Sequence, residues 1–593
     1  MSIYRERVEA LRRVMKERGV DAAIIPSADP HLGEYVPDHW RIITWLTGFT
    51  GSTATVVVTH DQAILFTDSR YYLQAEAELE GSGVSFRRPA VPGDNDYLSF
   101  LVSLTDKSCR VAADGRLFSV TRMRRIEEET GSSGIVTDTE CDLFEDIWTG
   151  RPPMPDSVAY DHSVIYSGKE RAVKISEMRE KMKEHGVTHH LLSSPDDIMW
   201  LLNIRGRDLD YTPVIFCFAL ITEQQILLFV DERKIGPRLA MAFDSEGIVI
   251  LPYEEASSMA DFIPGGSVVL LNPDSTSFSL YRSIPEGVRI KEEISIPAMM
   301  KAVKNRVEAE NLGRVMVKDG IALTRFFYWL EQNYGSASLN EYNVAEKLKD
   351  FRSEQPGFIC PSFNTIVAFN ENGAMPHYTA TPSSARAIGG RGVLLIDSGG
   401  QYPDGTTDIT RTVAFGIPDE KQKKDFTLVL RGMISLARAR FPYGTRGYQL
   451  DILARRHLWD QGLNYGHGTG HGVGFCLSVH EGPQSITPAE NRTIIVPGML
   501  LSDEPALYRE GEYGIRTENL ILCYEDEETE FGSFLRFDTL SLCYIDRALI
   551  DLSLLDSDEL AWLNDYHSEV YERLSPGLPA EEAEWLGRKT MEI

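Results

Sequence analysis

Asp397 and Asp408 form the first of two carboxylate pairs in this sequence whose spacing could carry chemistry. Apolar residues flank both, and the turn sequence Pro403-Asp404-Gly405 lies between them. Proline presets the first turn angle and glycine accepts a positive φ, so this segment predicts a β-hairpin. The midpoint of the two aspartates falls beside the turn. A hairpin would therefore bring their side chains roughly opposite each other, about 5 Å apart at Cβ.

Glu504 and Glu518 form the second pair, and the same reasoning applies to them. Their midpoint is Gly511, which lies within the stretch from Tyr508 to Gly514. A second hairpin would thus bring a second pair of carboxylates together. Two like charges about 4 Å apart repel by on the order of 4 kcal/mol even at an effective dielectric constant near 20. Each pair therefore requires a positive partner.

The alternative is that these acids occupy ordinary exposed positions in hairpins. Strongly apolar runs shortly before Asp397 and Glu504 argue against it, because they place both residues near the ends of buried strands. An unpaired carboxylate is costly in such a place. Arg411 and Arg516 are close enough in sequence to form structural salt bridges instead, so that interpretation stays open.

Histidines are the other candidate side chains. His467 and His471 lie in the segment His467–Gly474, in which four of eight residues are glycine. So many glycines argue against a helix and favour a strand or loop that approaches a ligand closely. His480 and His377 are further candidates. Each lone histidine is also compatible with a hydrogen-bonded core position.

Other kinds of catalytic site find no support in the sequence. An H-E-x-x-H zinc motif beginning at His480 would need its second histidine where Gln484 stands. The chain has no P-loop and no G-x-S-x-G nucleophile elbow. The two acidic pairs with their histidines are therefore the candidate site.

The local sequences around these residues resemble the pita-bread metallopeptidases, a family that includes methionine aminopeptidase, prolidase and Xaa-Pro aminopeptidases. The similar segments are IDSGGQYPDGTTDITRT (396–412), HGTGHGVG (467–474), VHEGP (479–483) and DEPALY (503–508). TGFTGS (47–52), TDSRY (67–71) and WLNDYH (562–567) extend the likeness to cytosolic three-domain Xaa-Pro aminopeptidases over nearly the whole chain. Cys360-Pro361 is a minor departure from these relatives.

The resemblance implies a set of metal ligands. Asp397 is expected to bind one metal ion and His471 the other, while Asp408 and Glu518 bridge both. Glu504 is expected to bind metal and to act as general base toward a bridging water or hydroxide. Four carboxylates carry about four negative charges, which two divalent ions neutralise. Oxygen-rich ligation with one imidazole favours Mn(II), the family expectation, although zinc and cobalt also fit these ligand types.

The resemblance also implies the reaction. Cleavage is expected between an N-terminal residue and a penultimate proline, with His377, His467 and His480 shaping the substrate pocket and stabilising the tetrahedral intermediate. Proline specificity rests on the resemblance alone. One alternative is therefore a prolidase-type Xaa-Pro dipeptidase. Another is a metal-free pita-bread binding protein, although such relatives typically lose several of the ligands that this chain retains.

Composition limits the partners and the compartment. A formal net charge of -28 argues against nucleic-acid binding, which requires clustered Lys and Arg. The N-terminus begins with a charged amphipathic helix pattern instead of a secretory signal, and the apolar run from Pro213 to Ile221 is too short to span a bilayer. The seven cysteines are scattered without a C-x-x-C. We expect a cytoplasmic protein with reduced thiols that acts on peptides and, by analogy, forms a homodimer.

An internal repeat organises the first half of the chain. KERGVDAAII (16–25) and KEHGVTHHLL (183–192) each predict a helix that ends at a glycine and leads into a buried strand. The predicted fold is α/β (α+β), with two related creatinase-type α/β domains over 1–158 and 159–297 and a linker at Arg151–Pro155. A pita-bread catalytic domain is expected over 298–545, beginning with one long helical pattern that includes Met299, Val303 and Val307. A helical C-terminal extension is expected over 546–593.

Overall fold

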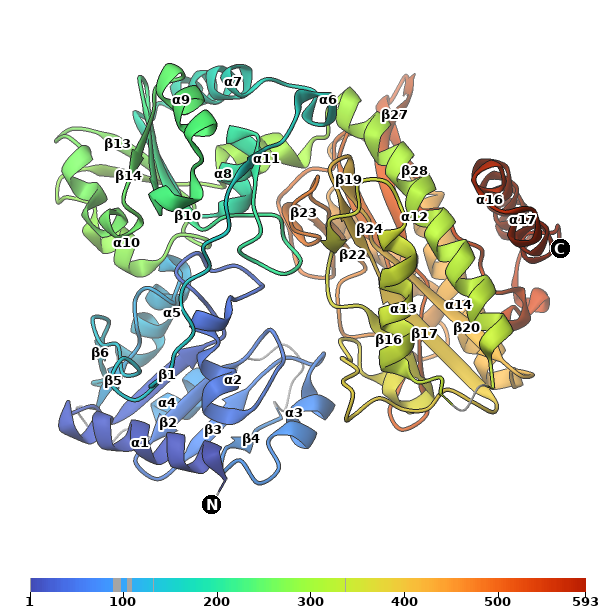
Figure 1. Ribbon diagram of the computed structural model, residues 1–593, viewed down its shortest axis with the longest axis horizontal. Coiled ribbons are helices and arrows are strands. Elements are labelled where there is room, and N and C mark those ends of the chain that lie inside the picture. The colour runs from blue at the N-terminus through green and yellow to red at the C-terminus, as the bar shows by residue number, and fades with distance from the viewer. Residues whose placement is uncertain (1, 89–96, 104–108, 132, 336–337) are drawn as a thin grey trace. The chain divides into compact units, whose positions relative to one another are not determined.

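The structure is a computed structural model that describes residues 2–88, 97–103, 109–131, 133–335 and 338–593 (Figure 1). Contacts divide the chain into two compact units. Unit 1 comprises Met1–Asp161, Lys169–Leu209 and Val214–Pro297. Unit 2 comprises His162–Gly168, Asp210–Pro213 and Ala298–Ile593. The three boundaries between the four domains expected from the sequence stay a prediction.

Unit 1 contains two six-stranded mixed sheets, drawn in blue and green in Figure 1. The first has the order β4 (Ser85–Phe86), β3 (Ala63–Phe66), β2 (Thr55–Thr59), β1 (Ala22–Pro26), β5 (Arg110–Ala112), β6 (Val136–Asp138). The second has the order β12 (Ile248–Leu251), β11 (Ile226–Val230), β10 (Cys217–Thr222), β8 (His189–Leu192), β13 (Val268–Leu271), β14 (Arg289–Glu292).

The two sheets confirm the predicted repeat. In both, the second, third and fourth strands of the order pair antiparallel with one another, and all other neighbouring strands pair parallel. Helix α1 (Ile3–Glu17) precedes β1, and α7 (Arg171–Glu184) precedes β8. Each helix is followed by a glycine with positive φ, +65° at Gly19 and +66° at Gly186, as a left-handed residue after a helix C-cap requires.

The remaining elements of unit 1 are short helices that cover these sheets and one two-stranded ladder. They are η1 (Asp38–Trp40), α2 (Ile42–Thr47), α3 (Tyr72–Glu78), α4 (Tyr97–Ser103), α5 (Val120–Gly131), α8 (Pro195–Leu202), η2 (Glu232–Lys234), α9 (Pro237–Ser245), η3 (Tyr253–Phe262), α10 (Phe278–Ser283) and the pair β7 (Tyr160–Asp161) with β9 (Ile204–Arg205).

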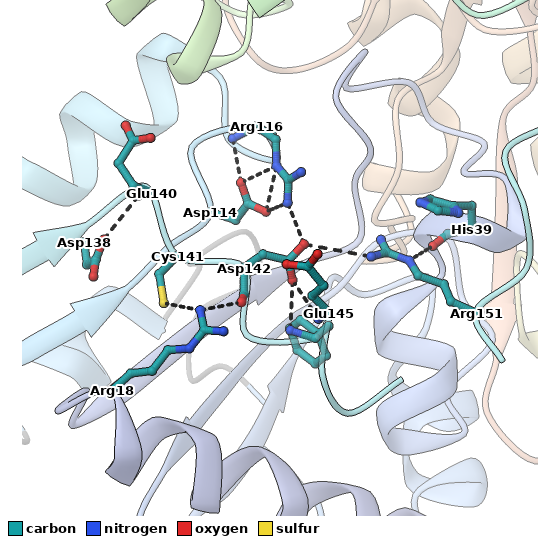
Figure 2. Close-up of polar contacts among 11 residues, drawn as sticks. Arg18, His39, Asp114, Arg116, Asp138, Glu140, Cys141, Asp142, Glu145 and Arg151 are labelled. Carbon is teal, nitrogen blue, oxygen red and sulfur yellow. Dashed lines mark hydrogen bonds and ion pairs between the residues drawn. The ribbon is translucent and has the colours of Figure 1, made fainter. Parts of the chain in front are cut away.

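Arg151, the first residue of the predicted linker, is tied to the first α/β domain (Figure 2). Its Nε donates to the carbonyl of His39 at 2.7 Å, and its guanidinium lies 4.6 Å from the ring centroid of Trp40. Asp142 connects this segment to Arg116, whose Nη2 donates to it at 2.7 Å. The start of the linker is therefore held on the domain that it leaves.

Unit 2 carries antiparallel sheets. Its strands are β15 (Cys360–Pro361), β16 (Ile366–Phe369), β17 (Gly392–Ser398), β18 (Gly400–Tyr402), β19 (Gly405–Thr406), β20 (Ile409–Phe415), β21 (Arg440–Pro442), β22 (Gly470–Gly472), β23 (Glu481–Ile486), β24 (Leu500–Asp503), β25 (Ala506–Arg509), β26 (Tyr513–Arg516), β27 (Asn519–Thr529) and β28 (Gly532–Thr539). The largest sheet has the order β21-β28-β27-β24-β22-β23, and smaller ones are β16-β17-β20, β15-β18-β19 and β25-β26.

The helices of unit 2 cover these strands and bury apolar residues in two main clusters, as Phe426 does in one and Leu450 in the other. They are α6 (Val164–Ser167), α12 (Arg306–Asn333), α13 (Glu341–Ser353), η4 (Asn370–Ala374), α14 (Glu420–Ala437), α15 (Gly447–Trp459), η5 (Arg547–Leu549), η6 (Leu552–Leu554), α16 (Ser557–Leu574), η7 (Ser575–Gly577) and α17 (Ala580–Lys589). The last two α-helices confirm the helical C-terminal extension, and Trp585 of α17 is almost completely buried.

The prediction of a single long helix from Ala298 is wrong, because the segment forms two helices. Helix α11 (Ile296–Ala302) ends at Ala302, and α12 begins at Arg306. Asn305 caps the second helix with a capping box, and the backbone N–H of Lys304 donates to the carbonyl of Gly498 instead of a helical partner. Among the residues that the structure describes, no helix combines the length and apolar character needed to cross a membrane.

Candidate metal centre

The first predicted hairpin is confirmed. Strands β17 and β20 pair antiparallel, and β18 pairs with β19 around the Pro403-Asp404 turn. In this register Asp397 lies opposite Thr410, so Asp408 is displaced by two residues from the position facing Asp397. A shift of two keeps both side chains on the same face, because side chains alternate with a period of two. The aspartates are therefore diagonal neighbours and not direct partners.

The second predicted hairpin is also confirmed, in the expected register. Asp503 of β24 lies opposite Asn519 of β27, and Ala506 of β25 lies opposite Arg516 of β26. Both ladders continue to the same pairing of Glu504 with Glu518, which lie between them. Glu518 is 1% exposed.

The two hairpins and strand β22 bring four of the five predicted ligands together. Nε2 of His471 lies 3.4 Å from Oδ2 of Asp408 and 3.6 Å from Oε1 of Glu504. Asp408, His471 and Glu518 each offer one ligand atom, and these atoms all lie within 4.8 Å of one another. Such a spacing lets one cation contact all three groups.

Asp397, the fifth predicted ligand, is linked to this group through Arg516. One guanidinium nitrogen of Arg516 donates to Oδ2 of Asp397, and its Nε donates to the hydroxyl of Thr410 at 3.0 Å. Thr410 donates in turn to Oε2 of Glu518 at 2.6 Å. Arg516 thus forms the structural salt bridge that the sequence leaves open as an alternative. Arg411 binds elsewhere, donating to backbone carbonyls that include those of Glu518 and Tyr544.

Exclusion of water raises the pKa values of three of these carboxylates. Burial is the main reason why the pKa values of Asp397 and Glu518 are raised, and the negative charge of Asp408 adds to it. Burial likewise raises the pKa of Glu504 to about 7. Burial disfavours the imidazolium of His471, but Asp408 and Glu504 outweigh that effect and raise its pKa to about 9. Without a cation the site therefore holds protons near neutral pH.

The donor set fits two divalent metal ions. Oδ1 of Asp397 is buried and has no hydrogen-bond partner among the described residues, so it can accept a cation. The carboxylates outnumber the permanently charged Arg516, so their repulsion adds to burial in raising the pKa values of Asp397, Glu504 and Glu518, and the site lacks positive charge. Two divalent ions would supply it. Carboxylate oxygens with one imidazole suit hard or borderline ions, and no cysteine takes part.

Two of the other predicted histidines lie next to this cluster. The ring centroid of His480 is 4.3 Å from that of His471, in an edge-to-face arrangement. Nε2 of His467 lies 2.9 Å from the hydroxyl of Tyr508, which accepts a hydrogen bond from Arg516 at 2.6 Å. The roles expected for these histidines stay predictions.

The fourth predicted histidine, His377, lies shortly after η4. Gly373 of η4 packs closely on β26, since a Cβ added to Gly514 would lie 1.7 Å from the Gly373 carbonyl oxygen. Tyr508 and Thr410 were not identified from the sequence. The only signal for Thr410 is its place two residues after Asp408 on the same strand face.

Comparisons with known proteins agree with this geometry. Residues 310–525 match the model of metallopeptidase family M24, and 533–593 match the C-terminal region of that family. Residues 7–141 and 150–308 each match a creatinase/prolidase N-terminal domain. The four matched regions follow one another along the chain in the same order as the sheets and the C-terminal helices described above.

Proteins similar to the chain over nearly its whole length carry related names. The chain is 36% identical to aminopeptidase P2 of Arabidopsis thaliana over 631 residues, covering 99% of this chain and 88% of that protein. It is 35% identical to a probable Xaa-Pro aminopeptidase P of Coprinopsis cinerea, covering 99% and 98%. A crystal structure of X-prolyl aminopeptidase from Caenorhabditis elegans, described as a cytosolic enzyme with a di-nuclear active site, superposes with a TM-score of 0.94 at 32% identity over 100% of both chains. The chain therefore belongs to the aminopeptidase P group of the M24 metallopeptidases.

Proposed function

We propose that this protein is an Xaa-Pro aminopeptidase that removes the N-terminal residue from peptides whose second residue is proline. The observation that carries the proposal is the convergence of Asp408, His471 and Glu518 from two hairpins and a glycine-rich strand, beside the open oxygen of Asp397. The substrate class is supported by the full-length relatives, which are named for Xaa-Pro cleavage.

In this proposal Asp397, Asp408, His471, Glu504 and Glu518 hold two divalent ions, with Mn(II) as the metal. When bound, such ions polarise a carbonyl group and increase the acidity of water. Glu504 takes a proton from the attacking water and delivers it to the nitrogen of the leaving proline. A carboxylate held beside the metals can accept this proton from water and release it again to the leaving group.

The histidines act on the substrate in this proposal. His480 and His467 lie close enough to His471 and Tyr508, respectively, to border the reacting bond. Together with His377 they donate hydrogen bonds to the carbonyl oxygen as it gains negative charge. Donors held in place before the reaction stabilise such an oxyanion by a few kcal/mol each.

A peptide assay tests the proposal. Purified protein is given Xaa-Pro-Yaa tripeptides, longer Xaa-Pro peptides, Xaa-Pro dipeptides and matched Xaa-Ala-Yaa peptides, each with and without a chelator. We expect chelator-sensitive cleavage of the first two classes only, restored best by Mn(II) among Mn(II), Zn(II) and Co(II). Cleavage of dipeptides alone would make the protein a prolidase-type dipeptidase. An inactive protein that binds no metal would be a binding protein of this fold.

Two further properties belong to the proposal. We place the enzyme in the cytosol, as the description of the Caenorhabditis elegans structure supports. We also expect a homodimer, which light scattering of the purified chain would test.

A further inference from the structure

Helix α15 carries a buried ion pair that the proposed mechanism does not use. Nε of Arg455 donates to Oδ2 of Asp451 at 2.6 Å, and the two side chains are only 2% and 3% exposed. A second pair with the same spacing lies at the end of this helix, between Arg456 and the C-cap residue Asp460, at 4.0 Å and with side chains 73% and 63% exposed. The remaining hydrogen-bonding groups of the buried pair bind the segment from Tyr465 to Thr469.

Arg455 directs its other N–H groups at the backbone before the glycine-rich strand. Nη1 donates to the carbonyl of Tyr465 at 2.9 Å, and Nη2 donates to the carbonyl of His467 at 2.6 Å. Nη1 also lies 3.3 Å from Oδ1 of Asn464. The guanidinium carbon is 3.8 Å from the ring centroid of Tyr465, so the ring covers the cation. One side chain thus binds two carbonyls on either side of a single residue.

Asp451 completes the contact on the other side of His467. Its Oδ1 accepts a hydrogen bond from the hydroxyl of Thr469 at 2.6 Å. That hydroxyl oxygen is 2.5 Å from the hydroxyl of Tyr465, which must be the donor because the Thr469 proton is already used. The carbonyl of Thr469 in turn accepts from the backbone N–H of Glu504 at 2.8 Å. The pair is therefore connected to the backbone of the proposed general base.

The segment that these groups hold has little stiffness of its own. Gly466, Gly468, Gly470 and Gly472 alternate with the other residues, and glycine loses more backbone freedom on ordering than any other residue. The two imidazoles that this segment carries must nevertheless face different partners. His467 meets Tyr508, whereas His471 meets Asp408 and Glu504.

We propose that Asp451 and Arg455 are positioning residues, which fix the backbone from Tyr465 to Thr469 and thereby set the places of His467 and His471. The proposal rests on the proposed roles of these two histidines. A buried ion pair contributes little net stability, because desolvation offsets most of its attraction. Replacing both partners by apolar residues of similar volume is often nearly neutral for stability. The carbonyls of Tyr465 and His467 lose donors in such a variant, so we expect a moderate loss of stability with the fold kept.

The test is the double variant Asp451→Leu/Arg455→Met. In metal-free protein, we expect amide hydrogen exchange over residues 465–472 to accelerate by about tenfold or more while the protein stays folded, with a thermal midpoint lowered by only a few degrees. With metal and an Xaa-Pro peptide, we expect kcat to fall about 100-fold and KM to change much less, since a displacement of about 1 Å in a catalytic group has that effect. The matched control is Asp460→Leu/Arg456→Met at the end of the same helix, which should alter neither quantity.

A single variant keeps the test decisive if the double variant does not fold. Arg455→Lys preserves the ion pair, but one ammonium cannot reach both carbonyls. We expect faster exchange over the same residues and a reduced kcat with Lys. Exchange and kcat equal to wild type in a folded double variant or in Arg455→Lys would overturn the proposal. The exchange measurement involves neither metal nor substrate, so an inactive wild type would refute the proposed function and leave this result interpretable.

Discussion

Glu504 is the residue on which the proposed chemistry depends most directly. Its carboxylate lies 3.6 Å from His471 and accepts a hydrogen bond from Ser502 at 3.3 Å. Glu504→Gln keeps the shape and removes the proton acceptor, so we expect kcat to fall by about 10²–10⁴-fold. The thermal midpoint of the metal-free protein should stay equal or rise, because a buried charge is lost. Glu512→Gln, an exposed acid on the same hairpin paired with Lys421, is the control. Appreciable turnover by Glu504→Gln would contradict its role as base.

The titration of the site predicts how the stability of the metal-free protein depends on pH. The folded-state pKa values of Glu504, about 7, and His471, about 9, both lie above the ordinary values. The folded state then binds more protons than the unfolded state, so stability is present at low pH and is lost as pH rises from about 5 to 9. Glu504 alone accounts for on the order of 3 kcal/mol.

Urea titrations of metal-free protein at several pH values measure this loss. Metal requires the deprotonated ligands, so saturating metal should flatten or reverse the slope. A metal-free protein whose stability increases between pH 5 and 9 would contradict the raised pKa values. The Glu504→Gln protein should show a smaller loss over the lower part of that range.

At the scale of the element, the strand that carries His471 depends on the absence of one side chain. A Cβ added to Gly470 would lie 2.0 Å from the carbonyl oxygen of Ser502, on the neighbouring strand β24. Gly470→Ala should therefore push β22 away from β24 and separate His471 from Glu504. We expect a loss of about 1–3 kcal/mol in unfolding free energy and a much larger proportional loss of kcat. Gly468→Ala meets nothing closer than 3.4 Å and is the control. Equal activity of the two variants would show that the close packing is not needed.

The hairpins were predictable because their chemistry is local. Pro403 and Gly405 mark one turn and the midpoint of Glu504 and Glu518 marks the other, and both turns are present. The offset of Asp408 by two residues follows from the turn, since Tyr402 pairs with Gly405 and leaves Pro403 and Asp404 as the two turn residues. The centre of the hairpin therefore lies one residue after the midpoint of the two aspartates, and the same register continues into β17 and β20.

The burial of the positioning residues Asp451 and Arg455 on α15, by contrast, could not be predicted from the sequence. Asp451 with Arg455, and Arg456 with Asp460, are both acid–arginine pairs four residues apart, and such pairs usually lie in solvent. Only the helix packing decides that the first is buried and the second exposed. Likewise, the break after Ala302 required the capping box of Asn305 to override an uninterrupted apolar pattern. Tertiary contacts select among local patterns that look equivalent.

At the scale of the whole molecule, the chain passes between the two compact units several times. Two short segments from the region of the second sheet, His162–Gly168 and Asp210–Pro213, belong to unit 2. Nε2 of His162 lies 2.7 Å from the carbonyl of Pro403, at the turn of the first hairpin. Nε2 of Gln401, on the adjacent strand β18, donates to the carbonyl of Tyr211 at 3.0 Å. The first hairpin is therefore completed by residues that precede the catalytic region in sequence.

The start of α12 is completed in the same way. Asn305 donates to the carbonyl of Ser167 at 2.9 Å, and Asn311 donates to the carbonyls of Ile165 and Tyr166 at 3.1 Å. Side chains at the start of α12, the longest helix of the described chain, thus donate hydrogen bonds to the carbonyls of α6. A catalytic unit defined by sequence alone, from residue 298 onward, lacks both borrowed segments.

Coexpression of residues 1–297 and 298–593 as separate chains tests this dependence. We expect them to copurify as a metal-responsive complex, and 298–593 alone to be unstable because the first hairpin and α12 lose their partners. Gly168→Ala in the first fragment should weaken copurification, since its Cβ would lie 2.4 Å from Oδ1 of Asn305 at a φ of +70°. Gly186→Ala, at a φ of +66° with nothing within 4 Å, imposes the same backbone strain without the collision and is the control. A 298–593 fragment that unfolds at the wild-type temperature on its own would show that the borrowed segments are dispensable.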